Sequence, residues 1–106
     1  MARVVLDSSV LIALISPKDH HHQTVLSSLT AKHQYAISAL TLTEALIAPN
    51  RLSASAGQQM LTAIKKSIHE VVDINSEIAV LAAQLRANTK ISLPDALISA
   101  TATATT

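Results

Sequence analysis

A chain of 106 residues with a formal net charge of +1 is long enough for one small domain, but too weakly charged to hold RNA by electrostatics alone. It has no cysteine, which excludes disulfides and thiolate metal sites and fits a reducing cytoplasm, and it has no apolar run near the roughly 20 residues that cross a membrane. Tyr35 is its only Phe, Trp or Tyr, which argues against a module that stacks bases on aromatic rings.

Short apolar strands alternate with helical segments along the chain. In chain order we predict a strand over residues 3–6, helices over 9–15 and 19–31, a strand over 35–37, helices over 41–48 and 53–68, a strand over 71–72, and helices over 76–87 and from Pro94 onward. Pro17 and Pro49 are expected to end the helices before them. This alternation predicts one α/β domain around a parallel sheet with right-handed crossovers.

The tail from Ala100 to Thr106 alternates alanine and threonine. A period of two is typical of a strand, whereas the apolar stripe before it is helical. The tail is therefore expected either to fray from the last helix or to begin a fourth strand.

Three of the seven acidic residues lie where an apolar run meets a helix. Asp7 follows the first strand, Glu44 is early in the helix after the second strand, and Asp95 is at the start of the last helix. In a parallel sheet these junctions gather at the edge where the strands end. Clustered carboxylates repel one another, and a hard divalent cation such as Mg²⁺ stabilises them while it binds substrate phosphate. These acids are a candidate metal site, with Ser9 placed to hold a carboxylate or a metal-bound water.

Each of the three acids also has a purely structural interpretation. The patterns Thr41-x-x-Glu44 and Ser92-x-x-Asp95 both match a helix capping box, and the Asp7 carboxylate can cap the helix that follows it. Capping and metal binding therefore remain alternatives at this point.

Two groups of basic residues invite a functional interpretation. The histidines of residues 20–22 point about 100° apart on a helix, so we interpret them as a solvated helix start rather than a metal site. Arg51, Lys65 and Lys66 are interpreted as solvated helix surface, with contact to an RNA backbone as the alternative.

Three segments resemble the PIN domain family, in particular the VapC-type toxins of toxin–antitoxin pairs. They are VVLDSSVLIAL, ISALTLTEAL and ISLPDALISATA, and their order and spacing agree along essentially the whole chain. The resemblance implies an α/β/α sandwich around a short parallel sheet and a Mg²⁺ or Mn²⁺ site. It implies that Asp7, Glu44 and Asp95 are the catalytic metal ligands and that Ser9 supports them.

The same resemblance implies a function. The implied function is that of a metal-dependent endoribonuclease, the toxin of a type II toxin–antitoxin pair. Such an enzyme hydrolyses single-stranded RNA through in-line attack of a water. A cognate antitoxin and usually a homodimer are the implied partners.

One feature departs from the family pattern. A further strand with another polar or acidic site residue normally follows the last helix, but no acid follows Asp95 in this chain. We therefore expect a single PIN-like domain over residues 1–106 that is short at its C-terminus, lacks the last strand and binds a second metal ion poorly or not at all.

The alternative function is a catalytically inactive PIN-like module that acts through protein–protein binding, and metal occupancy distinguishes the two.

Overall fold

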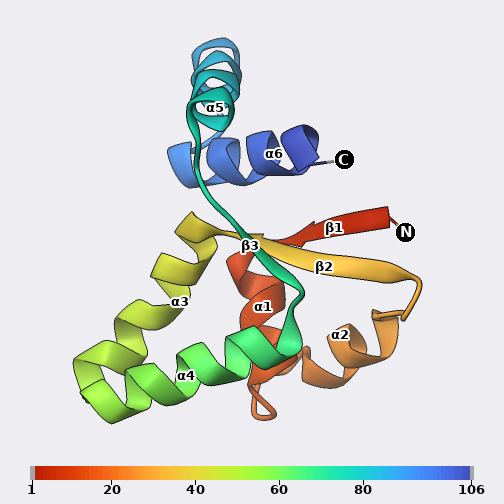
Figure 1. The fold of residues 1–106 in the computed structure, drawn as a ribbon, viewed down its shortest axis with the longest axis vertical. Coiled ribbons are helices and arrows are strands. Elements are labelled where there is room, and N and C mark those ends of the chain that lie inside the picture. Colours follow the sequence, from red (N-terminus) through yellow and green to blue (C-terminus); the bar gives the residue numbers. More distant parts are fainter. Residues whose placement is uncertain (1, 106) are drawn as a thin grey trace.

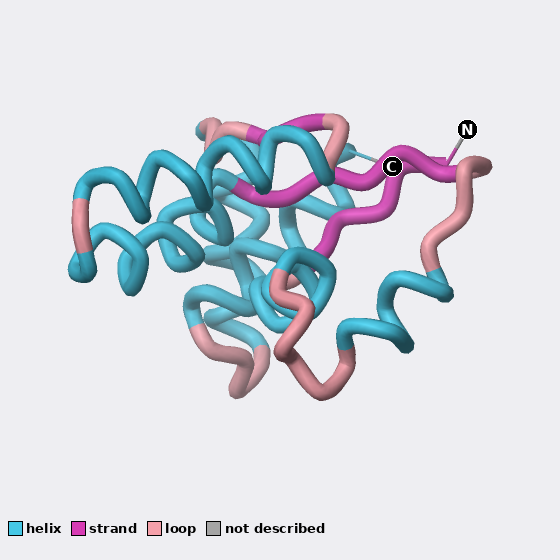
Figure 2. The backbone as a smooth tube through the Cα atoms, turned by 90° about the horizontal axis from the view of Figure 1, so that it is seen from below, coloured by secondary structure: helices cyan, strands magenta, loops and turns pink. Residues whose placement is uncertain are grey.

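A parallel three-stranded sheet organises residues 2–105, the part of the chain that the computed structural model describes (Figure 1). The elements are β1 (Ala2–Leu6), α1 (Ser8–Ile15), α2 (His22–Ser28), β2 (His33–Ser38), α3 (Ala39–Leu52), α4 (Ala54–Ser67), β3 (Glu70–Val72), α5 (Ser76–Asn88) and α6 (Leu93–Thr105). Figure 2 shows the strands side by side, with helix making up most of the remaining chain.

The three strands all run in the same direction. β1 pairs with β2 from Ala2↔His33 to Leu6↔Ile37, and β2 pairs with β3 from Ala36↔Glu70 to Ser38↔Val72. The strand order β1-β2-β3 places β2 in the centre. The carboxyl ends of all three strands therefore lie at one edge of the sheet, which we call the carboxyl edge.

Helices cover both faces of this sheet, each over its own apolar core. The strands contribute Leu6, Tyr35 and Ile37 to a core that packs against the helices between β1 and β3, with Leu11 and Ile64 among its buried members. The second core is formed by α5 and α6 and packs against Val72, which faces the opposite way from its neighbour Val71 because side chains alternate along a strand. Figure 1 shows α5 and α6 on one side of the sheet and α1 to α4 on the other, so the expected α/β/α sandwich is confirmed.

The prediction for α3 was wrong at both ends. A helix over 41–48 closed by Pro49 was expected, whereas α3 spans Ala39–Leu52 with Pro49 inside it. It begins earlier because the Ser38 hydroxyl accepts the Leu40 N–H at 3.1 Å. It continues past Pro49 and packs along α4, which offsets the roughly 3 kcal/mol cost of an interior proline.

Two other boundaries also differ from expectation. The helix expected over 19–31 is only His22–Ser28, because the Asp19 carboxylate and the Tyr35 hydroxyl hold the flanking turns by accepting the N–H groups of His21 and Thr30. The tail is helical through Thr105, so it neither frays nor forms a strand. The Thr101 and Thr105 hydroxyls each donate to the carbonyl four residues earlier at 2.8 Å. Thr106 lies outside the described residues.

The remaining elements match the predicted ones to within one or two residues at each end. Within residues 2–105, no strand pairs with the outer edge of β1. In that same part of the chain no helix is both long and apolar enough to cross a membrane.

Candidate metal-binding site

Asp7 occupies the first position after β1 and caps α1. Its Oδ1 accepts the Val10 N–H at 2.9 Å, so the capping interpretation is confirmed. The second carboxylate oxygen makes no hydrogen bond within residues 2–105, and the side chain is exposed. The cap therefore fixes the direction of the carboxylate while one oxygen remains free to bind a ligand.

Glu44 does not cap a helix. Because α3 begins at Ala39, Glu44 lies in the second turn, and Thr41 is a fully buried residue inside the helix rather than its N-cap. The capping-box interpretation of Thr41 and Glu44 is thus wrong. The Glu44 carboxylate is exposed and has no hydrogen bond or ion pair among the described residues.

Asp95 lies in the first turn of α6. The Ser92 hydroxyl accepts the Asp95 backbone N–H at 3.2 Å, which is one half of the expected capping box. The reciprocal bond is not formed, and within residues 2–105 the Asp95 carboxylate has no partner. Its charge near the first turn still suits the helix dipole, but both of its oxygens are free.

The topology brings these acids to the carboxyl edge. Asp7 follows Leu6, which pairs with Ile37, so Asp7 lies beside the start of α3. The helix α6 packs against β1, β2 and α3. Figure 1 shows that α6 starts near the same end of the strands as α3, at the left in this view, although the two helices cover opposite faces of the sheet. Ser9 is exposed in the first turn of α1, next to the Asp7 cap.

The side chains are not arranged as a closed metal cage. Among the described residues, no three His, Asp or Glu side chains are grouped so that they could hold a metal ion as placed. The chemistry of the donor set nevertheless fits a hard divalent cation, because it consists of exposed carboxylates with free oxygens. The three acids come from three separate segments of the chain, so Glu44 and Asp95 would have to turn toward the Asp7 carboxylate, which the cap holds, to share one cation.

A buried hydroxyl that was not predicted from the sequence lies next to this set. Thr41 is one helical turn before Glu44, and its Oγ1 is shielded from solvent without a hydrogen-bond partner. A buried polar group in that state costs about 1–3 kcal/mol. The Thr41-x-x-Glu44 pattern, interpreted only as a cap, was the signal that placed this hydroxyl beside the acid.

A groove borders Glu44, and it was also missed. It has a volume of about 630 Å³ and lies between the end of α1 and the facing sides of α3 and α4. Its lining is mainly apolar and includes Ile12, Ile15, Ala45, Ala48, Pro49, Met60 and Ala63, with Glu44 at one position. Two of its lining residues, Pro49 and Leu52, lie beyond the predicted end of the helix at residue 48.

The chain is similar to one protein family and to several solved structures. The PIN domain family matches residues 4–105. The structure superposes on a toxin–antitoxin complex from Klebsiella pneumoniae with a TM-score of 0.78 and 28% identity, over 95% of this chain and 78% of that chain. No curated protein sequence matches the chain.

Two further structures show the same fold at lower identity. VapBC2 from Rickettsia felis, bound to a promoter DNA fragment, gives a TM-score of 0.71 at 18% identity, over 94% of this chain and 78% of that chain. DNA-bound VapBC from Salmonella typhimurium gives a TM-score of 0.68 at 23% identity, over 94% of this chain and 78% of that chain. The family match spans nearly the whole chain and the sheet has the parallel order expected of it, so this chain belongs to the PIN domain family.

Proposed function

We propose that this chain is a metal-dependent endoribonuclease that hydrolyses single-stranded RNA. The observation that carries the proposal is the set of three acids at the carboxyl edge, each with a free carboxylate oxygen. PIN domains are generally nucleases, and the match to that family over residues 4–105 supports the same chemistry here.

Asp7, Glu44 and Asp95 are the residues that would hold Mg²⁺ or Mn²⁺. When bound, the cation supplies Lewis acidity at the phosphate and lowers the pKa of water. The Val10 N–H holds the Asp7 carboxylate in one orientation through Oδ1. Ser9, in the first turn of α1, would orient Asp7 or a water through its hydroxyl.

The test is cleavage of a mixed-sequence single-stranded RNA by the purified protein with Mn²⁺, Mg²⁺ or EDTA. We expect cleavage with either metal and none with EDTA. Calorimetric titration with Mn²⁺ in the absence of RNA gives an independent measure of the site. A folded protein that neither cleaves RNA nor binds Mn²⁺ would instead be the inactive PIN-like module that acts through protein binding.

The groove beside Glu44 is a candidate docking surface for a cognate antitoxin. The structure with 28% identity is a toxin–antitoxin complex, which supports a protein partner for this chain. The groove is mainly apolar, and Ile12 beside it is 44% exposed, so a partner that covers it removes apolar surface from water. The expected homodimer stays a prediction, which a mass measurement in solution checks.

Placing a charge in the groove tests this docking surface. Ala48→Arg is expected to prevent co-purification with a co-expressed cognate antitoxin, because a large charged side chain would fill the groove where the partner docks. Val80→Arg is the matched control, since Val80 is 57% exposed on α5, outside the groove. If a folded Ala48→Arg protein still co-purifies with the antitoxin as well as the wild type does, the antitoxin binds another surface.

A further inference from the structure

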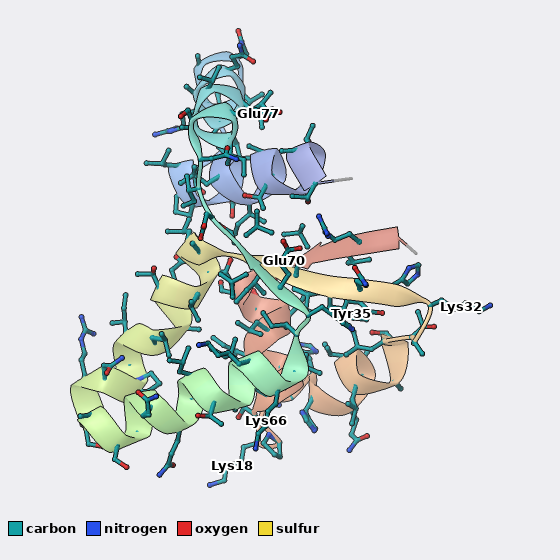
Figure 3. The ribbon with its side chains drawn as sticks, viewed as in Figure 1. Lys18, Lys32, Tyr35, Lys66, Glu70 and Glu77 are labelled. Carbon is teal, nitrogen blue, oxygen red and sulfur yellow. The ribbon has the colours of Figure 1, made fainter. Side chains whose placement is uncertain are left out.

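A histidine side chain attaches the end of α4 to the sheet. Two hydrogen bonds of 2.8 Å join Tyr35 of β2 to His69, the residue before β3. The His69 backbone N–H donates to the Tyr35 carbonyl, and the Tyr35 backbone N–H donates to Nδ1 of the His69 ring. Figure 3 shows Tyr35 beside the turn that leads from α4 into β3. The imidazole thus extends the pairing of β2 with β3, which otherwise starts at Ala36↔Glu70.

This bond determines the protonation state of the ring. A backbone N–H can only donate, so Nδ1 must accept, and His69 is neutral with its proton on Nε2. A protonated ring would turn an N–H toward the Tyr35 N–H, which would then have no acceptor. Tyr35 is a buried member of the core, and an unpaired N–H at such a position costs free energy. The attachment therefore requires the neutral form of His69.

The charged groups near His69 do not favour its protonated form. From α4, Lys65 lines the same small cavity of about 190 Å³ as His69 and Glu70, and its positive charge opposes a second one. Glu70 pairs with Arg3 of β1 at 3.1 Å, and within residues 2–105 no carboxylate forms an ion pair with a histidine. Protonation of His69 would therefore break a hydrogen bond without gaining an ion pair.

His33 is the other histidine beside Tyr35. Its ring centroid is 6.3 Å from that of Tyr35, and the His69 centroid is 6.2 Å from the same ring. The His33 Nδ1 is shielded from solvent and has no hydrogen-bond partner in the described part of the chain. Protonation of both its ring nitrogens would bury an N–H without an acceptor, so burial also favours neutral His33. His33 is thus the alternative source of any sensitivity to acid at this end of the sheet.

We propose that His69 is a pH-sensitive contact: its neutral ring holds the turn between α4 and β3 on β2, and acid releases that turn. A histidine free of such contacts takes up a proton at about pH 6.5, whereas the bond to Tyr35 excludes a proton from Nδ1. The released state therefore binds one more proton in acid, so the stability of the attachment falls as the pH falls. That stability is present above about pH 6.5 and is lost progressively below it.

The first measurement is urea unfolding of the whole chain at pH 7.5 and pH 5.5. One histidine that must be neutral in the folded state raises the unfolding constant about tenfold between these two values. His69→Asn keeps an acceptor for the Tyr35 N–H, because its amide oxygen takes the place of Nδ1 but does not titrate. The rise in the unfolding constant is therefore expected to be about tenfold larger for the wild type than for His69→Asn.

His20→Asn is the matched control for the loss of one histidine. His20 is exposed, and its side chain has no hydrogen bond among the described residues. Its variant should show the same rise in the unfolding constant as the wild type. An equal rise in the wild type and in His69→Asn would overturn the proposal. If His33→Asn alone removes the pH dependence, the acid sensitivity belongs to His33 and the proposal also fails.

Nitrogen-15 NMR of the wild type is the second measurement, and it does not depend on whether a variant folds. At pH 5.5 the His69 ring of the folded protein should still have an unprotonated Nδ1 and a proton on Nε2. The exposed His20 ring should be mostly protonated at the same pH. Equal protonation of the two rings would mean that the bond to Tyr35 does not hold His69 neutral, and the proposal would be overturned.

Discussion

Glu44→Gln is expected to lower metal-dependent RNA cleavage by about 100-fold while the stability of the fold stays the same. A bound metal contributes several kcal/mol of transition-state stabilisation, and each 1.36 kcal/mol is a tenfold change in rate. Losing the charge of one of three ligands is expected to remove about 3 kcal/mol of that contribution. The fold is unaffected because the Glu44 carboxylate is exposed and has no partner within residues 2–105.

Three measurements together identify the role of Glu44. Cleavage rate and Mn²⁺ affinity should both fall, whereas the free energy of unfolding in urea should stay within about 0.5 kcal/mol of the wild type. Glu77→Gln is the matched control, since Glu77 is also an exposed helical glutamate but lies in the first turn of α5. Full activity in a folded Glu44→Gln protein would remove Glu44 from the metal site.

The elements that carry the three acids were predicted from local patterns. Val4, Val5 and Leu6 form a short aliphatic run typical of a buried strand. Residues 9–15 are apolar and predict a helix, and the structure has both elements. Parallel pairing then follows from helical crossovers between short strands. This is why the sequence alone was enough to predict that the strands end at one edge, whereas the grouping of the three acids there stays a prediction.

Interactions between distant elements decided what the sequence missed. Local preference ends a helix at Pro49, but packing along α4 keeps α3 intact to Leu52, and the groove follows from that packing. The Ser38 hydroxyl, at the end of a buried strand, sets the start of α3 and so removes Glu44 from the capping position. The packing along α4 is not visible in a short window of sequence, whereas the Ser38 cap is a local signal that could have been predicted.

Capping and metal binding looked like alternatives for Asp7, yet the structure makes them compatible. Oδ1 accepts the Val10 N–H, and the second oxygen is free. Two substitutions therefore separate the roles, because asparagine caps a helix about as well as aspartate and alanine does not. We expect Asp7→Asn and Asp7→Ala both to lose cleavage by at least about 100-fold. Only Asp7→Ala should also lose about 1 kcal/mol of stability.

Asp7→Asn should leave stability nearly unchanged because two small effects oppose each other. The neutral side chain loses its favourable interaction with the dipole of α1, about 0.3–1 kcal/mol, while repulsion from Glu44 and Asp95 is relieved.

Mn²⁺ supplies a readout that does not depend on activity. At ten times its Kd, a bound metal stabilises the wild type by about 1.4 kcal/mol. For a domain of this size that raises Tm by about 6–11 °C. The Asp7→Asn protein should show little of that rise, since its ligand charge is gone although its cap remains. If Asp7→Asn instead costs as much stability as Asp7→Ala and Mn²⁺ raises Tm in every variant, then Asp7 serves only α1 and the metal binds elsewhere.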